Sequence, residues 1–149
     1  MKIYIGADYR GFEKKQKLIK SLADRGYDVS DEGAYEYAEG DDFNDPAITV
    51  AKAVREDNGS RGILICDSAH GVTIQANRFK RVRAAHCTDA ESAILAREHD
   101  DANVLCISAH SIDESEMLEI AQTFLTTNFE ENERRDRRIN RLDERGDYD

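Results

Sequence analysis

The stretch GILIC at residues 62–66, followed by DSAHG at 67–71 and VTIQANR at 72–78, decides the fold. Residues 62–66 form a continuous apolar run, which is typical of a strand buried on both faces of a parallel sheet. Residues 67–71 are polar and contain glycine, which indicates a turn, and residues 72–78 suit a helix. The stretch therefore predicts a strand–turn–helix step, the repeating unit of an α/β fold.

The same alternation continues on both sides of this stretch. Short segments rich in β-branched or aromatic residues predict strands, and apolar residues at helical spacing predict helices. Strict alternation predicts an α/β protein with a doubly wound, Rossmann-like open sheet of about five parallel strands, helices on both faces and a helical C-terminal tail. We expect strands at residues 2–6, 27–29, 62–66, 82–87 and 103–107, and helices at 12–22, 46–54 (starting at Pro46), 72–78, 90–99 and 117–125.

Composition restricts the domain organisation and the partners. The 149 residues include 21 Lys and Arg against 31 Asp and Glu, a formal net charge of −10. This length predicts a single domain, residues 1–149, that ends in a charged segment at 129–149. The negative charge argues against nucleic acid and anionic membranes as partners. No apolar run approaches the roughly 20 residues that a membrane-spanning helix needs.

The cysteines and the N-terminal residues indicate the compartment. Cys66, Cys87 and Cys106 are odd in number and far apart in the chain, which suits a reducing cytosol better than a disulfide framework. The opening residues show no signal-peptide pattern. We therefore expect a cytoplasmic protein.

Cys66 is the first candidate for chemistry. In open α/β sheets, ligands bind beyond the carboxyl ends of the strands, here at Asp8-Tyr9, residues 66–71 and His86-Cys87. We expect the N–H groups and dipole of the following helix to favour the Cys66 thiolate and to hold an anion. A packed structural cysteine is the alternative, and it is the role that we expect for Cys87 and Cys106.

Other candidate positions each have a structural alternative. Asp8 could contact a ligand beyond the first strand, or it could cap the next helix. His99 suits proton transfer near neutral pH, or it could serve only as a cation at a helix C-terminus. Arg134 and Arg138 are four residues apart and could bind a phosphate from one helix face, or they could belong to a solvated helix with Glu–Arg pairs.

Six segments match, in order, the motifs of one known family. They are the opening MKIYIGADYRGFEKKQKL, DFND at 42–45, GILIC at 62–66, IQANR at 74–78, AREHDDANVL at 96–105, and the tail from Phe129 through Arg134 to Arg137-Arg138-Ile139. These segments resemble the sugar-phosphate isomerases of the ribose-5-phosphate isomerase B / galactose-6-phosphate isomerase (RpiB/LacAB) family. The resemblance covers nearly the whole chain.

The resemblance implies an activity and its catalytic groups. It implies an aldose–ketose isomerase that converts ribose-5-phosphate to ribulose-5-phosphate, or a related pentose or hexose phosphate, through an enediol. Cys66 would move a proton between C1 and C2, Ser68 would assist it, and His99 would open the sugar ring. No metal or cofactor is implied, and the sequence has no zinc, Walker or dinucleotide-binding motif.

The resemblance also implies how substrate is bound. Asp8 would bind substrate hydroxyls, the amides of residues 67–71 would stabilise the enediolate, and Arg134 and Arg138 would bind the phosphate. Family members are dimers or tetramers with active sites between subunits, so we expect a homodimer or homotetramer. The expected substrate-binding residues are Asp8, Tyr9, Asp67, Ser68, Ala69, His70, Gly71, Asp100, His110, Arg134 and Arg138.

The chain departs from the family pattern within the implied site. Tyr9, Asp100 and His110 stand where the family has His, Asn and Arg, and residues 66–71 lack two of the family's glycines. A carboxylate at Asp67 would disfavour a thiolate if it points inward. A second interpretation therefore remains, a non-catalytic or altered-specificity sugar-phosphate-binding paralogue. A scaffold that binds no ligand is a third and less favoured interpretation.

Overall fold

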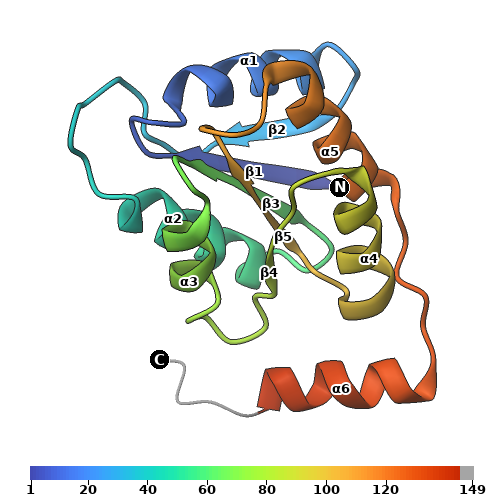
Figure 1. Cartoon of the computed structure of the whole chain (residues 1–149). Coiled ribbons are helices and arrows are strands. Elements are labelled where there is room, and N and C mark those ends of the chain that lie inside the picture. The colour runs from blue at the N-terminus through green and yellow to red at the C-terminus, as the bar shows by residue number, and fades with distance from the viewer. Residues whose placement is uncertain (145–149) are drawn as a thin grey trace.

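A parallel sheet of five strands forms the centre of the computed structural model, which describes residues 1–144 (Figure 1). The strand order is β2-β1-β3-β5-β4, and all four pairings are parallel. This confirms the predicted open α/β sheet. The strands are β1 (Lys2–Ala7), β2 (Asp28–Asp31), β3 (Arg61–Cys66), β4 (Ala84–His86) and β5 (Val104–Ser108).

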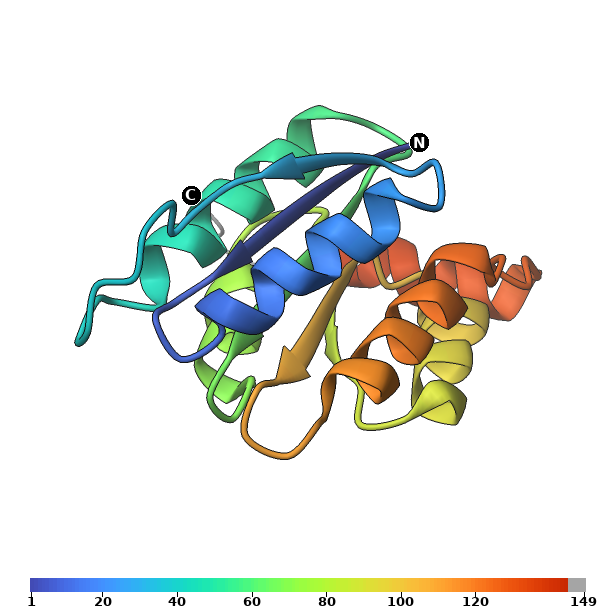
Figure 2. The ribbon, with the colours of Figure 1, turned by 90° about the horizontal axis from the view of Figure 1, so that it is seen from above.

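Helices cover both faces of the sheet (Figure 2). In β3, Ile63 and Ile65 pack into a core with α1, α4 and α5, whereas Leu64 and Cys66 pack into a second core with α2 and α3. Successive side chains of a strand point to opposite faces, which explains why β3 is apolar at every position from Gly62 to Cys66. The helices are α1 (Phe12–Ala23), α2 (Asn44–Glu56), α3 (His70–Ala76), α4 (Ala90–Asp100), α5 (Glu114–Thr126) and α6 (Glu133–Glu144).

Some element boundaries differ from the sequence-based prediction. Helix α2 begins at Asn44 and not at Pro46. The N–H groups of a helix's first turn have no carbonyl partner within the helix, so a proline, which has no N–H, is tolerated there. Helix α3 begins at His70, inside the predicted turn. Strand β4 has only three residues and lies at the sheet edge, where β5 is its one neighbour. Helix α5 begins after Asp113, whose carboxylate accepts the Glu116 N–H at 2.9 Å.

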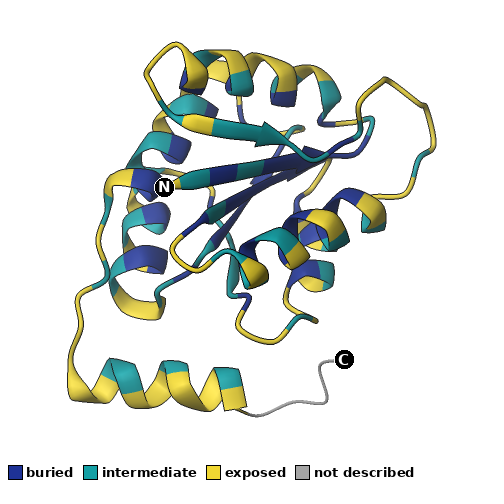
Figure 3. Ribbon diagram, turned by 180° about the vertical axis from the view of Figure 1, so that it is seen from behind, coloured by how far each residue is buried: buried dark blue, intermediate teal, exposed yellow. Residues whose placement is uncertain are grey.

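Helix α6 confirms the predicted helical tail, but it lies apart from the sheet. None of its residues is buried (Figure 3). It contacts α4, and the Arg83 guanidinium binds its Asp143 carboxylate at 3.0 Å. Among residues 1–144, no helix combines the length and apolar character that a bilayer crossing requires.

The chain reverses its direction of winding between β1 and β3. From β1 it moves outward to the edge strand β2, and it then crosses to β3 on the other side of β1. Such a switch point leaves a crevice beyond the carboxyl ends of the two strands, where α/β proteins bind ligands. Asp8 follows β1 and Cys66 ends β3, so the fold places both at this position.

Candidate active site

Three strands deliver the predicted residues to the carboxyl edge of the sheet. Asp8 and Tyr9 follow β1, residues 66–71 follow β3, and His110 follows β5. The backbone joins the last two segments, because the Ala109 N–H donates to the Cys66 carbonyl at 2.8 Å and the His110 N–H to the Asp67 carbonyl at 3.1 Å. The structure therefore brings Asp8, Tyr9, Cys66, the turn and His110 to one edge.

A close backbone approach sets Asp8 beside β3. A Cβ atom on Gly11 would lie 2.6 Å from the Ile65 carbonyl oxygen, so only glycine lets the turn after β1 pack so closely on β3. Asp8 Oδ1 accepts the Gly11 N–H at 3.2 Å, whereas α1 has no side-chain cap. Asp8 thus orders this turn and does not cap the helix. It is 7% exposed, and burial raises the pKa of its carboxyl group.

The Cys66 thiol lies in a mixed environment. Burial raises its pKa, the N–H groups of Val72 and Ala69 lower it, and the Asp8 and Asp67 carboxylates raise it further. The N–H groups at the helix start and the Asp67 carboxylate therefore act in the directions expected, and burial makes the net shift upward. A base with a raised pKa is a stronger proton acceptor once it is ionised.

The other two cysteines differ from Cys66. Burial raises the pKa of Cys87 to about 11 and that of Cys106 to about 12. Both are free and buried, as is Cys66. Their position in the core and their high pKa values fit the predicted packing role.

The turn between β3 and α3 adopts a conformation that glycine usually supplies. Ala69 has a φ of 68°, in the left-handed region, and it is fully buried. The Thr73 hydroxyl donates to the Ala69 carbonyl at 2.6 Å and the His70 N–H donates to Ser68 Oγ at 3.3 Å. At Gly71 a Cβ atom would lie 2.7 Å from the Phe43 ring, so this glycine permits a close contact.

Asp67 and His110 face each other across the edge. His110 Nδ1 lies 3.8 Å from Asp67 Oδ1, and both side chains are exposed. The Asp67 backbone is fixed more firmly, because Ser108 Oγ donates to its carbonyl at 2.6 Å. An exposed pair at this distance contributes little to stability, so both side chains can turn toward a ligand.

A family model described as ribose/galactose isomerase matches residues 3–142. The chain belongs to this isomerase family. It is 38% identical over 146 residues to the ribose-5-phosphate isomerase B of Mycobacterium tuberculosis, covering 97% of this chain and 89% of that protein. It is 41% identical over 128 residues to a probable ribose-5-phosphate isomerase B of Mycoplasma pneumoniae, covering 86% and 84% respectively.

Solved structures of the same isomerase agree with this fold. A Mycoplasma genitalium ribose-5-phosphate isomerase B with bound ribulose-5-phosphate superposes with a TM-score of 0.90 at 37% identity, covering 95% of this chain and 93% of that chain. The Thermotoga maritima ribose 5-phosphate isomerase superposes with a TM-score of 0.92 at 37% identity, covering 97% and 98%. Both span nearly the whole chain, as the resemblance predicted.

The remaining predicted residues of this isomerase-family chain lie elsewhere. His99 and Asp100 end α4, which starts near the carboxyl edge and runs back to the opposite, amino edge. Next to them, Asp101 pairs with Arg83, which precedes β4. Helix α6 lies on the same side of the molecule as the end of α4, away from the carboxyl edge (Figure 2). One chain therefore does not bring His99, Asp100, Arg134 or Arg138 to Cys66.

Helix α6 presents its arginines to solvent. Arg134 and Arg138 are exposed and share a helix face, as their spacing predicted. Within residues 1–144 neither has an ion-pair partner, whereas Arg135 binds Glu130 at 2.7 Å. Arg135 thus forms the Glu–Arg pair that the solvated-helix alternative predicted, whereas within the described part of the chain the guanidinium groups of Arg134 and Arg138 are free to bind an anion.

Two further residues lie near the edge: His86, which the sequence placed at a strand end without assigning it a role, and Asp41, which the sequence-based reasoning missed. The His86 ring lies 5.4 Å from that of His70, and burial and His70 lower the pKa of His86. Asp41 Oδ1 accepts the Tyr9 N–H at 2.9 Å. His86 ends a predicted strand, which was a usable signal, whereas Asp41 lies in a long loop without any pattern. Across residues 1–144, no group of three His, Cys, Asp or Glu side chains could hold a metal ion.

Proposed function

We propose that this chain is an aldose–ketose isomerase that interconverts ribose-5-phosphate and ribulose-5-phosphate, with Cys66 as the base. The observation that carries the proposal is a cysteine at the switch-point edge, beside buried Asp8, in a chain of the ribose/galactose isomerase family. The relative with bound ribulose-5-phosphate supports a phosphorylated sugar as substrate.

The proposed reaction moves one proton between adjacent carbons. The Cys66 thiolate removes the proton from C2 of the open-chain aldose, which forms an enediolate with its negative charge on the C1 oxygen. The proton of the C2 hydroxyl passes to the C1 oxygen, and the thiol returns its proton to C1 as the C2 oxygen becomes the ketone. Backbone N–H groups of residues 67–71 stabilise the charge on oxygen, Ser68 assists Cys66, and Asp8 binds substrate hydroxyls.

We further propose that the site is completed by a second copy of the chain. His99 would open the sugar ring, and Arg134 and Arg138 would bind the phosphate, each from a partner in a homodimer or homotetramer. The exposed arginine face of α6 and the distance of α4's end from Cys66 support this arrangement. Tyr9, Asp100 and His110 would line the same shared site and adjust which sugar is accepted.

The domain and compartment expectations become proposals in the same way. We propose one domain, residues 1–149, which the family match over residues 3–142 supports. Its charged tail at 129–149 includes five residues, 145–149, outside the described part. The three free cysteines support a cytoplasmic location.

The substitution Cys66→Ala tests the proposed reaction. Loss of the general base should lower kcat for ribose-5-phosphate by about 100-fold or more, measured as formation of ribulose-5-phosphate. Cys87→Ala is the matched control, because it removes another buried thiol and should retain activity. Thermal unfolding must show that both variants are folded.

The other outcomes are equally informative. Full activity in Cys66→Ala would contradict the assignment of the base. A wild-type protein that turns over no pentose or hexose phosphate, but gains thermal stability with them, would instead be the sugar-phosphate-binding paralogue.

A further inference from the structure

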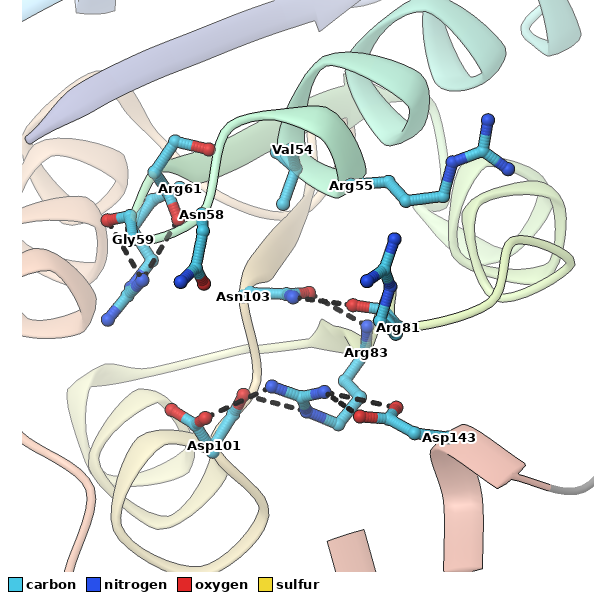
Figure 4. Close-up of a pocket in the computed structure, with 11 residues that line it drawn as sticks. Val54, Arg55, Asn58, Gly59, Arg61, Arg81, Arg83, Asp101, Asn103 and Asp143 are labelled. Carbon is cyan, nitrogen blue, oxygen red and sulfur yellow. Dashed lines mark hydrogen bonds and ion pairs between the residues drawn. The ribbon is translucent and has the colours of Figure 1, made fainter. Parts of the chain in front are cut away.

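The amino edge of the sheet contains a cavity of about 490 Å³ that the proposed isomerase reaction does not use. It lies between the end of α2, the start of β3 and the segment before β4 (Figure 4). The six residues of β3 span about 17 Å and separate it from Cys66. Its lining includes Arg55, Arg61, Arg81 and Arg83, four of the arginines of a chain whose net charge is −10.

The two carboxylates that line this cavity already bind arginine side chains. Asp143 binds the Arg83 guanidinium through both oxygens at 3.0 and 3.1 Å. Asp101 Oδ2 binds Arg83 at 3.0 Å, and its Oδ1 binds Arg97 at 2.8 Å. In Figure 4 the Arg83 guanidinium is directed between these two carboxylates, whereas that of Arg81 points toward Arg55. Arg83 therefore contacts both carboxylates of the lining, one of them shared with Arg97, and within residues 1–144 the lining has two carboxylates against four guanidinium groups.

The other three arginines keep most of their hydrogen-bonding capacity. Arg61 donates only to the carbonyls of Gly59 and Ser60, at 3.3 and 2.9 Å. Arg55 lies 3.8 Å from the exposed Glu56 carboxylate, too far for a hydrogen bond. Among residues 1–144 the Arg81 guanidinium has no hydrogen-bond or ion-pair partner. Burial and the neighbouring Arg97 and Arg83 lower the pKa of Arg61, and the Asp101 carboxylate offsets only part of this.

A buried hydroxyl supplies an independent observation. Ser60 lines the cavity and is only 3% exposed, yet its Oγ has no partner in the described part of the chain. Buried hydroxyls normally form hydrogen bonds, because an unpaired one has lost its contact with water and gained nothing in return. The chain covers the Oγ atom in this conformation, and a rotation of the Ser60 side chain toward the cavity would let it donate to a ligand that accepts hydrogen bonds.

Arg81 is held in place by its own backbone. Its φ is 65°, in the left-handed region, and the Asn103 amide donates to its carbonyl at 2.8 Å. Asn103 Oδ1 in turn accepts the Arg83 N–H at 2.8 Å. Residues 81–83 are therefore fixed relative to β5, and the Arg81 side chain is presented to the cavity at a conformational cost.

We propose that this cavity is a binding site for a small molecule that carries a diphosphate group. More than one guanidinium lacks an anion, so a multiply charged ligand fits better than a single carboxylate, and arginine pairs well with phosphate oxygens. The volume exceeds what one phosphate fills and lies within the range of small-molecule sites. The site is separate from the proposed active site and stands on different residues.

Pyrophosphate titration tests the proposal in a background without the proposed active-site anchors. The full chain carrying Arg134→Ala and Arg138→Ala should still bind pyrophosphate in isothermal titration calorimetry at physiological salt without magnesium. Adding Arg81→Gly should weaken binding about tenfold or more, because it removes one charge-assisted contact. Glycine suits the left-handed conformation, so this variant should melt no lower than its parent.

Two further variants separate a ligand site from a structural role. Ser60→Ala should weaken pyrophosphate binding several-fold without lowering the melting temperature, since the hydroxyl has no protein partner to lose. Arg78→Ala is the control, because Arg78 is an exposed arginine close in sequence but outside the lining, and binding should be unchanged. The proposal is overturned if the background variant binds no pyrophosphate, or if Arg81→Gly binds as tightly as its parent.

Discussion

The carboxyl and amino edges of this sheet carry opposite polar chemistry. At the carboxyl edge, Cys66 and Asp8 are buried, and burial together with the nearby carboxylates raises the pKa of the thiol. At the amino edge and on α6, arginines outnumber their carboxylate partners and are mostly half-buried or exposed. A base belongs at the first edge and anions at the second. We propose that the carboxyl edge and the arginine face of α6 are two half-sites for a sugar phosphate, which meet between two copies of the chain.

Mixing two inactive variants is the strongest way to break this comparison. Cys66→Ala and Arg138→Ala each remove one half-site and should each lose most of the isomerase activity. In a symmetric dimer formed at random from equal amounts, half the dimers are mixed and each contains one intact site. Activity should then recover to about a quarter of the wild-type value, a gain of more than about tenfold over either variant.

The recovery is measured after the two variants are unfolded together and refolded. Each variant refolded alone is the control, and size-exclusion chromatography reports the oligomer. If the mixture is no more active than its components, the two half-sites do not meet across a subunit interface.

The carboxyl edge and helix α6 also differ in how firmly side-chain contacts hold them to the rest of the fold, and stability measurements can test this difference. Lys15 is 0% exposed, and its Nζ binds Asp31 Oδ1 at 2.6 Å and the Ala34 carbonyl at 2.5 Å, which fixes the segment after β2 at the carboxyl edge. Lys15→Ala should lower the free energy of unfolding by about 3 kcal/mol, because a buried pair loses one partner. Asp143→Ala, which frees the end of α6, should cost only about 1 kcal/mol, since Asp101 still pairs with Arg83.

Urea unfolding measures both values. Lys17→Ala is the control for a lysine on the same helix, because its pair with Glu114 is exposed and should contribute little to the free energy of unfolding. Equal losses for Lys15→Ala and Asp143→Ala would show that α6 is anchored as firmly as the carboxyl edge.

The sequence was sufficient for the parts that depend on local pattern. The apolar run at 62–66 and its neighbours predicted the five strands, and motif order predicted the family, because strand burial and backbone turns leave periodic signals. The Cys66 pKa was not predictable in sign, since burial by α2 and α3 competes with the N–H groups of α3 and only packing sets the balance.

The position of helix α6 relative to the sheet could not be predicted from the sequence, for a different reason. Spacing showed that Arg134 and Arg138 share a face, but not that α6 would lie at the amino edge away from Cys66. The arginine cavity had no signal at all, because Arg55, Arg61, Arg81 and Arg83 come from separate segments that only the fold brings together.

The pH profile tests the electrostatics of the carboxyl edge. If the Cys66 thiolate is the base, kcat/KM rises with pH as the thiol ionises, and the raised pKa moves this rise to higher pH. Asp67→Asn removes a negative charge that raises this pKa, so the rise should move to lower pH by a fraction of a unit. Activity at pH 7 should increase by about threefold at most.

The control for this profile is Asp28→Asn, an exposed carboxylate at the start of β2 that contacts Lys2 and should leave the rise in place. A shift of the Asp67→Asn profile toward higher pH would contradict the view that Asp67 opposes the thiolate.

The smallest expected effect compares two residues with positive φ, one at each edge. Ala69 and Arg81 have φ values of 68° and 65°, a conformation that costs a non-glycine residue about 1–2 kcal/mol. Glycine would relieve this cost at both positions, but it would add about 0.5–1 kcal/mol of conformational entropy to the unfolded chain. These terms are the same for both residues, so burial decides the difference.

Ala69 is fully buried and its methyl group contributes about 0.8 kcal/mol by packing, whereas the exposed Arg81 side chain loses no protein partner. Ala69→Gly should therefore leave the free energy of unfolding nearly unchanged, and Arg81→Gly should raise it by about 0.5 kcal/mol. Paired urea titrations measure this difference of about 0.5–1 kcal/mol. A larger increase in the free energy of unfolding for Ala69→Gly than for Arg81→Gly would contradict this. It would mean that backbone strain at Ala69, beside Cys66, exceeds the stabilisation from burying its methyl group, and that the carboxyl edge is the more strained of the two edges.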